Sequence, residues 1–265
     1  MKTRIPFISL ALTLFFLIVC GPLQAYGAGR IDLVVDRGTS RDVEAAARAA
    51  IEATNDFFKK VYGLTLERKV EIFLVPDRQA HIKELKQRYS LTETEAASRA
   101  QSTSGSALDG IIIVNAANTG GKQGLFFCLC HELVHYFQGQ VSRNFCAIMW
   151  LTEGTANVLA AQIMAAAGVQ CLEAGLWPEV LKRGPGIPRL EHLHSFKDWG
   201  TTINSYGQAT AYAVSSMAVV TLIRAKGNKP LFAFFQGLNK AKPEDAFYQA
   251  FGVKLADFEK NFRPY

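Results

Sequence analysis

The sequence predicts an α+β fold in which a small mixed sheet forms an N-terminal lobe and helices form most of a C-terminal lobe. Three short runs rich in β-branched residues lie before residue 115, a pattern typical of strands. From residue 122 onward the apolar residues follow the helical period of about 3.6 residues. A turn with two adjacent glycines, Gly120 and Gly121, separates the two patterns. We therefore expect lobes over residues 26–121 and 122–265, forming one unit with a ligand cleft between them.

The N-terminal lobe carries clear signals for where its helices begin and end. Ser40 is a suitable N-cap for a first helix, and Gly63 can end it in a left-handed conformation. Asp77 and Thr92 are suitable caps for two further helices. We therefore expect strands over residues 31–35, 69–75 and 110–114, helices over 40–62, 77–89 and 92–101, and a loop of small polar residues over 102–106.

The C-terminal lobe has the pattern of successive helices, with a break rich in glycine and proline at residues 184–188. Its helices are expected over residues 123–138, 152–167, 203–225, 230–238, 243–251 and 255–262. Thr152 is a suitable N-cap for the second of these helices. Glu153 is then expected in the first turn of that helix.

Composition and charge limit the classes of function. The chain has 265 residues, of which 49% are hydrophobic and 20% charged, so it can bury a substantial core. The formal net charge is +6, but lysines and arginines are scattered and form no basic stripe among aromatic residues. We therefore expect no nucleic acid among the partners.

The first 25 residues are typical of a signal peptide. Lys2 and Arg4 give a positive start, an apolar run over residues 5–19 follows, and small residues after it suit cleavage. The run is short for a membrane span, which needs about 20 residues. We expect an exported, periplasmic or extracellular protein that contacts a membrane only through this segment. Two alternatives stay open: an uncleaved anchor, and a lipid anchor at Cys20, which is less favoured because Val19 before it is not small.

Export permits disulfides, and four cysteines follow the signal segment: Cys128, Cys130, Cys146 and Cys171. No two of them form a CxxC pair, so the sequence does not indicate a structural zinc knuckle. A bridge from Cys171 to Cys128 or Cys130 is one interpretation, and four buried thiols are the other.

The chemistry of the chain is concentrated in HELVH at residues 131–135, which has the form HExxH. On a helix, His131 and His135 lie one turn apart on the same face and can bind one metal ion. Glu132 lies beside them and can take a proton from water that the metal activates. The flanking residues are apolar, and buried imidazoles need a partner that a metal supplies. The alternative is a chance HExxH on a surface helix.

A second motif offers a third ligand. Fifteen residues after His135 begins the segment WLTEGTA, residues 150–156, and its Glu153 can complete a set of two histidines and one glutamate. A catalytic Zn²⁺ uses three protein ligands and leaves a position for water, as this set does. The alternative is a glutamate that only interacts with the helix dipole. The sequence therefore predicts a Zn²⁺ site made of His131, His135 and Glu153.

HELVH followed by WLTEGTA resembles the gluzincin metallopeptidases, the thermolysin-like superfamily, and WLTEG is similar to a motif of its aminopeptidase branch. The resemblance implies that His131, His135 and Glu153 bind zinc. It implies that Glu132 is the general base. It also implies that Asn157 takes the place of an acid that orients the first histidine, a role in which its carbonyl oxygen can accept a hydrogen bond.

The resemblance also implies a substrate strand. In the family, an extended peptide pairs with an edge strand before the active-site helix and becomes a further strand. The residues that resemble this edge strand are Gly110, Ile111, Ile112 and Ile113. A core strand buried on both faces is the alternative. The resemblance is strong over residues 110–167, moderate over 206–262 and weak before residue 68.

The family places a tyrosine or histidine that stabilises the oxyanion well after the third ligand. Tyr206 is the first choice in this chain, Tyr212 is an alternative, and His192 and His194 are weaker ones. The chain lacks a GxMEN-type segment before HELVH and an Asp-rich calcium region. These departures leave a likeness to the small stand-alone gluzincin-like domains of bacterial exported proteins.

The leading interpretation is an exported zinc metallopeptidase, more specifically an endopeptidase, that hydrolyses a peptide or protein substrate. Glu132 would act as the base and Tyr206 would stabilise the oxyanion. The competing interpretation is a catalytically silent domain of the same shape that serves as an envelope binding or assembly module. Every residue that the chemistry requires is present, which favours the enzyme.

Overall fold

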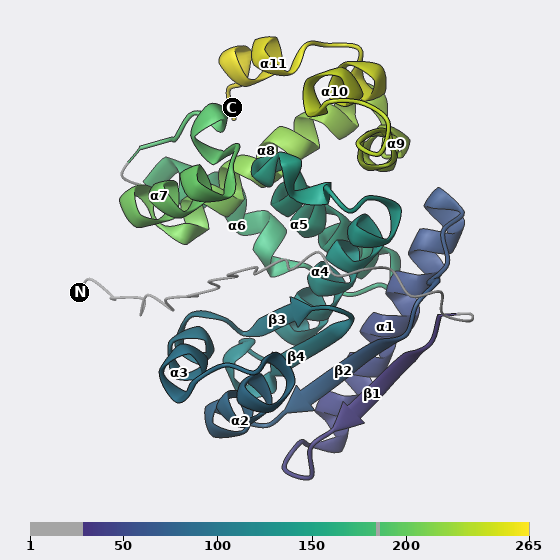
Figure 1. The fold of residues 1–265 in the computed structure, drawn as a ribbon, viewed down its shortest axis with the longest axis vertical. Coiled ribbons are helices and arrows are strands. Elements are labelled where there is room, and N and C mark those ends of the chain that lie inside the picture. The colour runs from purple at the N-terminus through teal and green to yellow at the C-terminus, as the bar shows by residue number, and fades with distance from the viewer. Residues whose placement is uncertain (1–28, 184–185, 265) are drawn as a thin grey trace, which may run out of the picture.

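A four-stranded mixed sheet with flanking helices forms the N-terminal lobe, and helices form almost all of the C-terminal lobe (Figure 1). The structure is a computed structural model that describes residues 29–183 and 186–264. The predicted α+β class is confirmed. The predicted signal segment, residues 1–25, and the alternative lipid site at Cys20 lie outside the described residues.

The sheet joins three parallel strands and one antiparallel strand. β1 (Ile31–Val35), β2 (Val70–Val75) and β4 (Ile111–Asn115) run parallel, and β3 (Gly105–Leu108) pairs antiparallel with β4. The strand order is β1-β2-β4-β3, so β4 lies between β2 and β3. The description of residues 110–113 as an edge strand is therefore wrong, because both sides of β4 are already paired. The core-strand alternative is correct, and β3 occupies this edge of the sheet.

The helices of the N-terminal lobe begin at the predicted caps. They are α1 (Arg41–Tyr62), α2 (Arg78–Tyr89) and α3 (Glu93–Ser102). The side chains of Ser40, Asp77 and Thr92 each accept a hydrogen bond from the backbone amide three residues later. α1 ends at Gly63, whose φ of 69° is the left-handed conformation that glycine adopts without strain.

Alternate residues of the central strands face two separate cores. Ile72 of β2 and Ile112 of β4 face the larger core, which α1 and the first long helix of the C-terminal lobe cover. Phe73 and Ile113 face a smaller core under α2 and α3 (Figure 1). Because both faces are covered, the aliphatic run of β4 is buried as its composition predicts.

The edge strand β3 begins inside the segment 102–106 that the sequence predicted as a loop and continues two residues beyond it. Its four residues read GSAL, which are small and have little intrinsic preference for strands. Backbone pairing with β4 forms the strand instead. The hydroxyl of Tyr89 donates to the carbonyl oxygens of Ser106 and Ile111, at 2.7 and 3.0 Å, and so joins α2 to both strands. Tertiary contacts therefore override local preference at this edge.

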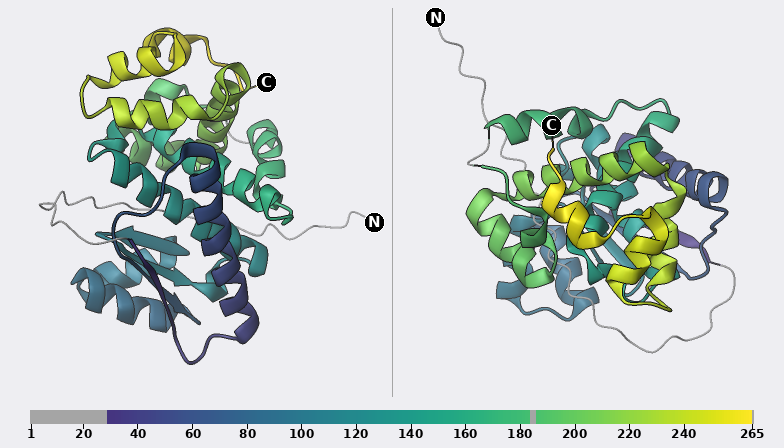
Figure 2. Two further views of the ribbon diagram at one scale, coloured as in Figure 1. Left: turned by 90° about the vertical axis from the view of Figure 1, so that its right-hand side faces the viewer. Right: turned by 90° about the horizontal axis from the view of Figure 1, so that it is seen from above.

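The C-terminal lobe is a bundle of helices, of which α9 to α11 lie at the end of the molecule away from the sheet (Figures 1 and 2). Its helices are α4 (Lys122–Val141), α5 (Met149–Ala166), α6 (Leu172–Arg183), α7 (Phe196–Tyr206), α8 (Gln208–Lys226), α9 (Lys229–Gly237), α10 (Pro243–Phe251) and α11 (Leu255–Asn261). Short 3-10 turns are η1 (Ala116–Asn118), η2 (Phe145–Ala147) and η3 (Leu190–Leu193).

Two predicted helices of this lobe differ from the structure. α5 begins at Met149, so Thr152 is not its N-cap and Glu153 lies beyond the first turn. The predicted helix over residues 203–225 is divided into α7 and α8 at Gly207, whose φ is 82°. α6 was not predicted, since Pro178 lies inside it and interrupts the expected pattern.

Within the described ranges, no helix is long and apolar enough to cross a membrane. All four cysteines that follow the predicted signal segment are free thiols in the structure. Cys128 and Cys130 are buried, and Cys146 and Cys171 are half-buried. The thiol interpretation of these residues therefore describes the structure better than a bridge does, although only two of the thiols are fully buried.

His81 of α2 is completely buried, and neither of its ring nitrogens has a hydrogen-bond partner within the part of the chain that the structure describes. Burial, together with repulsion from Arg99, lowers the pKa of His81 from 6.5 to about 4. The native protein therefore holds this imidazole neutral at pH values where the unfolded chain binds a proton.

This difference predicts a pH-dependent stability. Between about pH 4 and 6.5 the unfolded state binds more protons at His81, so the free energy of unfolding should rise with pH by roughly 3 kcal/mol. His81→Leu should remove most of this rise, whereas His192→Leu, at an exposed histidine, should leave it intact. Urea unfolding at several pH values measures the effect. An unchanged pH dependence in His81→Leu would refute the assignment.

Candidate metal centre

Two long helices bring His131, His135 and Glu153 together. The histidines lie one turn apart on α4, and their Nε2 atoms are 3.0 Å from each other. Glu153 comes from α5, and its Oε2 lies 3.5 Å from Nε2 of His131 and 3.4 Å from Nε2 of His135. All three side chains are at most 2% exposed. The structure thus places three potential ligand atoms around one point in the interior.

The spacing of these atoms suits a tetrahedral ion. Two ligand atoms at about 2.1 Å from such an ion lie about 3.4 Å apart, close to the distances between Glu153 and the two histidines. Oε2 of Glu153 makes no hydrogen bond of standard geometry within the described residues. A buried carboxylate oxygen without such a partner is costly unless a cation or a donor compensates it.

No model of a known protein family matches this chain, and no curated protein matches it. The buried triad of His131, His135 and Glu153 fits a zincin-like site and can hold a metal ion. Two imidazoles and one carboxylate are a donor set that Zn²⁺ accepts.

The electrostatics of the triad favour a positive charge between its members. Burial lowers the pKa of His131. Burial acts in the same direction on His135, but Glu153, Glu132 and Gln138 together outweigh it and the pKa of His135 is raised. For Glu153, burial alone would raise the pKa, but the attraction of His135 and hydrogen bonds from both histidines lower it. The triad therefore holds an ionised carboxylate against a cation, which is the place that a metal ion would take.

Each histidine also contacts a neutral amide side chain through Nδ1. His131 Nδ1 is 2.9 Å from Oδ1 of Asn157, and Nδ2 of Asn157 donates to the hydroxyl of Ser216 at 3.1 Å. His135 Nδ1 is 2.7 Å from Oε1 of Gln138. The structure thus brings Asn157 to the histidine that the sequence predicted. Gln138 was missed, although its position three residues after His135 on one helix was a signal that could have found it.

Glu132 lies between the metal ligands and the edge strand. Its side chain is completely buried, and neither carboxylate oxygen has a hydrogen-bond partner among the described residues. A methyl group added at Gly105 of β3 would lie 3.1 Å from Oε1 of Glu132, so the strand backbone passes next to this carboxylate. Burial, with a smaller contribution from Glu153, raises the pKa of Glu132 to about 8. A carboxyl group with a strongly raised pKa beside potential metal ligands is a candidate for proton transfer.

The two candidate tyrosines lie in different surroundings. Tyr212 of α8 is buried, and its ring centroid is 6.2 Å from that of His131. Burial and the nearby carboxylates of Glu153 and Glu132 raise its pKa well above the usual value, and its hydroxyl makes no hydrogen bond of standard geometry within the described chain. Tyr206 is half-buried at the end of α7, where its ring faces Gly186. The structure therefore brings Tyr212 to the triad, and Tyr206 stays a prediction.

The two weaker histidine candidates have other surroundings. His192 is exposed in η3. His194 donates from Nδ1 to Oε1 of Glu259 at 3.0 Å, and the same oxygen accepts from Trp150 Nε1 at 2.8 Å. Because Trp150 precedes Glu153 by about one helical turn, this contact ties α11 to the ligand-bearing part of α5.

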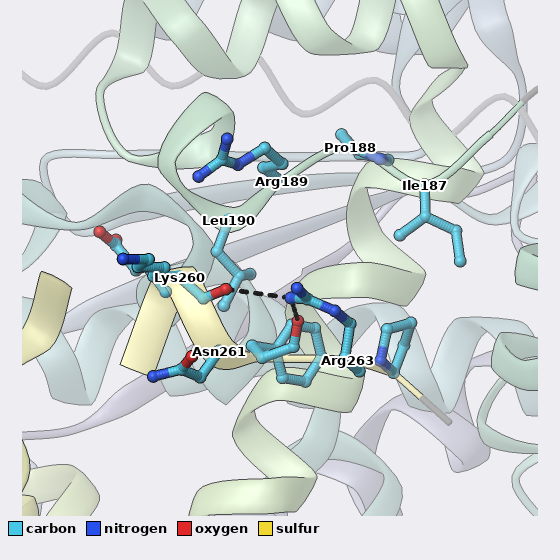
Figure 3. A pocket seen from close by; sticks show the side chains of 10 residues that line it. Ile187, Pro188, Arg189, Leu190, Lys260, Asn261 and Arg263 are labelled. Carbon is cyan, nitrogen blue, oxygen red and sulfur yellow. Dashed lines mark hydrogen bonds between the residues drawn. The ribbon is translucent and has the colours of Figure 1, made fainter. Parts of the chain in front are cut away.

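A pocket of about 540 Å³ lies between residues 187–190 and the C-terminal segment 259–264 (Figure 3). Arg263 donates to the carbonyl oxygens of Lys260 and Phe262 at one side of it. None of the three triad residues lines this pocket. It is therefore separate from the candidate metal centre.

Gly154, which follows the glutamate ligand, allows α5 and α8 to pack closely. A methyl group added at Gly154 would lie 2.4 Å from the carbonyl oxygen of Ser215, far inside van der Waals contact. The same helix α8 carries Tyr212 and Ser216, which contact His131 and Asn157. The glycine of WLTEG thus lets α8 reach the metal centre.

Gly154→Ala is expected to force the two helices apart and to destabilise the fold by about 1–3 kcal/mol. Gly175→Ala is the matched control, because an added methyl group at this position of α6 meets nothing within 4 Å. In a helix such a change is neutral or stabilising by up to about 1 kcal/mol. Thermal unfolding of both variants measures the difference, and equal midpoints would contradict the close packing.

Proposed function

We propose that this protein is an exported zinc-dependent metallopeptidase of the gluzincin type. The observation that carries the proposal is the buried triad of His131, His135 and Glu153 with Glu132 beside it, whose carboxylate has no partner within the described residues. An inert core would not retain four such groups together, because burying unpaired polar atoms costs free energy. A bound metal ion would compensate this cost and would leave the carboxylate of Glu132 beside the ion, where it can act as a base.

His131, His135 and Glu153 would hold the ion. When bound, Zn²⁺ supplies Lewis-acid polarisation of a carbonyl group and lowers the pKa of water. Glu132 would accept a proton from the attacking water and return it to the leaving amine. The positive charge of an ion held by the triad would favour the ionised form of Glu132, which a base requires. The hydroxyl of Tyr212 would donate a hydrogen bond to the oxyanion of the tetrahedral intermediate.

The substrate class is proposed to be an extended peptide. Among the described residues, one side of β3 pairs with no other strand, and Gly105 in β3 lies next to Glu132. A peptide that adds to this edge would place its backbone beside the base, with its amide groups paired to those of β3. Export is supported by the apolar N-terminal segment of the sequence.

Metal analysis combined with a peptide library tests the proposal. The purified protein should contain about one equivalent of zinc and cleave some members of a broad library. A chelator should abolish cleavage, and added Zn²⁺ should restore it. Zinc at one equivalent with no cleavage of any peptide would favour the binding-module alternative. Absence of zinc binding would contradict both the metal centre and the enzyme.

The two tyrosines give a matched comparison. Tyr212→Phe should lower kcat by about 10²- to 10³-fold with little change in KM, because a donor to the oxyanion acts mainly in the transition state. Tyr206→Phe should leave kcat within a few fold of wild type, since this ring faces Gly186. Steady-state kinetics on one cleaved peptide measure both. A larger loss of kcat in Tyr206→Phe than in Tyr212→Phe would instead assign the hydrogen bond to the oxyanion to Tyr206.

A further inference from the structure

Gln138 is a buried polar residue of α4 whose side-chain amide has two contacts. One end contacts His135, a proposed metal ligand, and the other end binds a backbone carbonyl. It lies three residues after His135 and is completely buried. Its Oε1 is 2.7 Å from Nδ1 of His135, and its Nε2 donates to the carbonyl oxygen of Thr152 at 3.0 Å. Each end of this amide therefore faces a group whose role as hydrogen-bond donor or acceptor can be assigned.

The carbonyl of Thr152 decides which way the amide points. A backbone carbonyl oxygen only accepts hydrogen bonds, so the amino end of Gln138 must face it. Oε1 then faces His135, and because Oε1 also only accepts, Nδ1 of His135 must carry the hydrogen. When the ring is neutral, the lone pair of His135 is therefore on Nε2, the atom that faces Glu153. This tautomer is the one that binds a metal through Nε2.

The same amide also joins the two ligand helices. Thr152 immediately precedes Glu153, and its hydroxyl donates to the carbonyl oxygens of Phe145 and Ile148 at 2.6 and 3.1 Å. Gln138 is thus attached to a backbone segment that is itself held in place. Through this contact, α4 with its two histidines is fixed relative to the third ligand on α5.

The first histidine has no equally determined partner. Asn157 contacts His131 through Oδ1, but its other end meets the hydroxyl of Ser216. A hydroxyl can donate or accept, so this contact allows either orientation of the Asn157 amide. Gln138, rather than Asn157, is therefore the amide whose surroundings set a histidine tautomer without a metal ion.

We propose that Gln138 is a positioning residue, which holds His135 in its metal-binding tautomer and fixes the spacing between the ligand helices. The inference rests on the proposed zinc site. It predicts that His135 of the metal-free protein keeps its hydrogen on Nδ1 when the ring becomes neutral and the Nε2 proton is released. Histidine ring nitrogens of different protonation have different ¹⁵N chemical shifts, so NMR reads this state directly.

Three variants test the proposal. Gln138→Met keeps the length of the side chain and removes both hydrogen bonds. Gln138→Glu keeps an acceptor for His135 but places a second oxygen against the Thr152 carbonyl. Gln140→Met is the matched control, because Gln140 lies on the same helix and also bridges backbone groups, accepting from the amide of Glu67 and donating to the carbonyl of Thr65.

Gln138→Met is expected to weaken zinc binding by about 10- to 100-fold in a competition titration, and Gln140→Met by less than about threefold. In the metal-free protein, the neutral ring of His135 should no longer be held in the single Nδ1–H form in Gln138→Met, whereas Gln138→Glu should keep this form. Gln138→Glu should therefore bind zinc more tightly than Gln138→Met. If Gln138→Met does not fold, the NMR measurement on Gln138→Glu tests the tautomer by itself.

The proposal is overturned if Gln138→Met binds zinc as tightly as Gln140→Met, or if the neutral ring of wild-type His135 carries its hydrogen on Nε2. Failure of the proposed function would give a different experimental result. A wild-type protein that binds no zinc would contradict the metal centre, while the NMR measurement on that metal-free protein would still decide whether Gln138 sets the tautomer.

Discussion

Replacing Glu132 with glutamine is expected to lower peptide hydrolysis by about 10²- to 10⁴-fold and to leave zinc bound, because only the base is removed. Glutamine has nearly the same shape, so it fits the space next to Gly105 of β3. It cannot accept the proton of water at neutral pH. The three ligand atoms come from other residues, and zinc affinity should therefore stay close to that of wild type.

The stability of the metal-free variant gives an independent check. The pKa of Glu132 is raised to about 8, above its usual 4.5, so the native state holds a proton that the unfolded chain releases between these values. The free energy of unfolding of metal-free wild type should therefore fall as pH rises through this window. Glu132→Gln should remove that fall and be the more stable protein at pH 8.

A control separates loss of the base from loss of charge in general. Glu84→Gln changes a glutamate of α2 that pairs with Arg88 on the same helix. It should retain wild-type hydrolysis, because α2 covers the smaller core on the other face of the sheet from α4. Undiminished hydrolysis by Glu132→Gln would rule out this carboxylate as the base.

The sequence predicts best the parts of the fold that depend on local side chains. The caps Ser40, Asp77 and Thr92 fix helix starts within a few residues, so their helices are found where expected. The strand β3 pairs with β4 across a tight turn at Asp109 and Gly110, both with positive φ, and this Asp-Gly pair was a local hairpin signal that the prediction missed. The start of α5 was misplaced because Thr152 directs its hydroxyl to carbonyl oxygens rather than to a free amide.

In the candidate site, too, the features that depend on local side chains could be predicted, and those that depend on packing could not. The three potential ligands could be predicted because helical spacing places His131 and His135 on one face, and because Glu153 lies in a motif of known form. The approach of Tyr212 to these residues depends on helix packing, which a single sequence does not contain. Tyr212 reaches the triad because Gly154 lets α8 approach α5. The division of the long predicted helix at Gly207 moved Tyr206 from the start of one helix to the end of another.

Glu153→Gln is expected to weaken zinc binding by roughly 10²- to 10³-fold, since one ligand of a structural zinc site contributes about 2.5–4 kcal/mol of a total of about 10–16. The amide keeps the size of the side chain but removes the charge that a dication requires. In the metal-free protein the same change removes the attraction that raises the pKa of His135, so that pKa should fall.

The ranking of variants then distinguishes a ligand from an orienting residue. Asn157→Ala leaves all three ligand atoms in place and removes one contact to His131, so it should weaken zinc binding by only about tenfold. Competition titrations against a chelator of known affinity measure both variants on one scale. If Asn157→Ala weakened zinc binding as much as Glu153→Gln, Glu153 would not be a ligand. Removing an atom bound to the ion should cost more than removing a side chain that only orients another ligand.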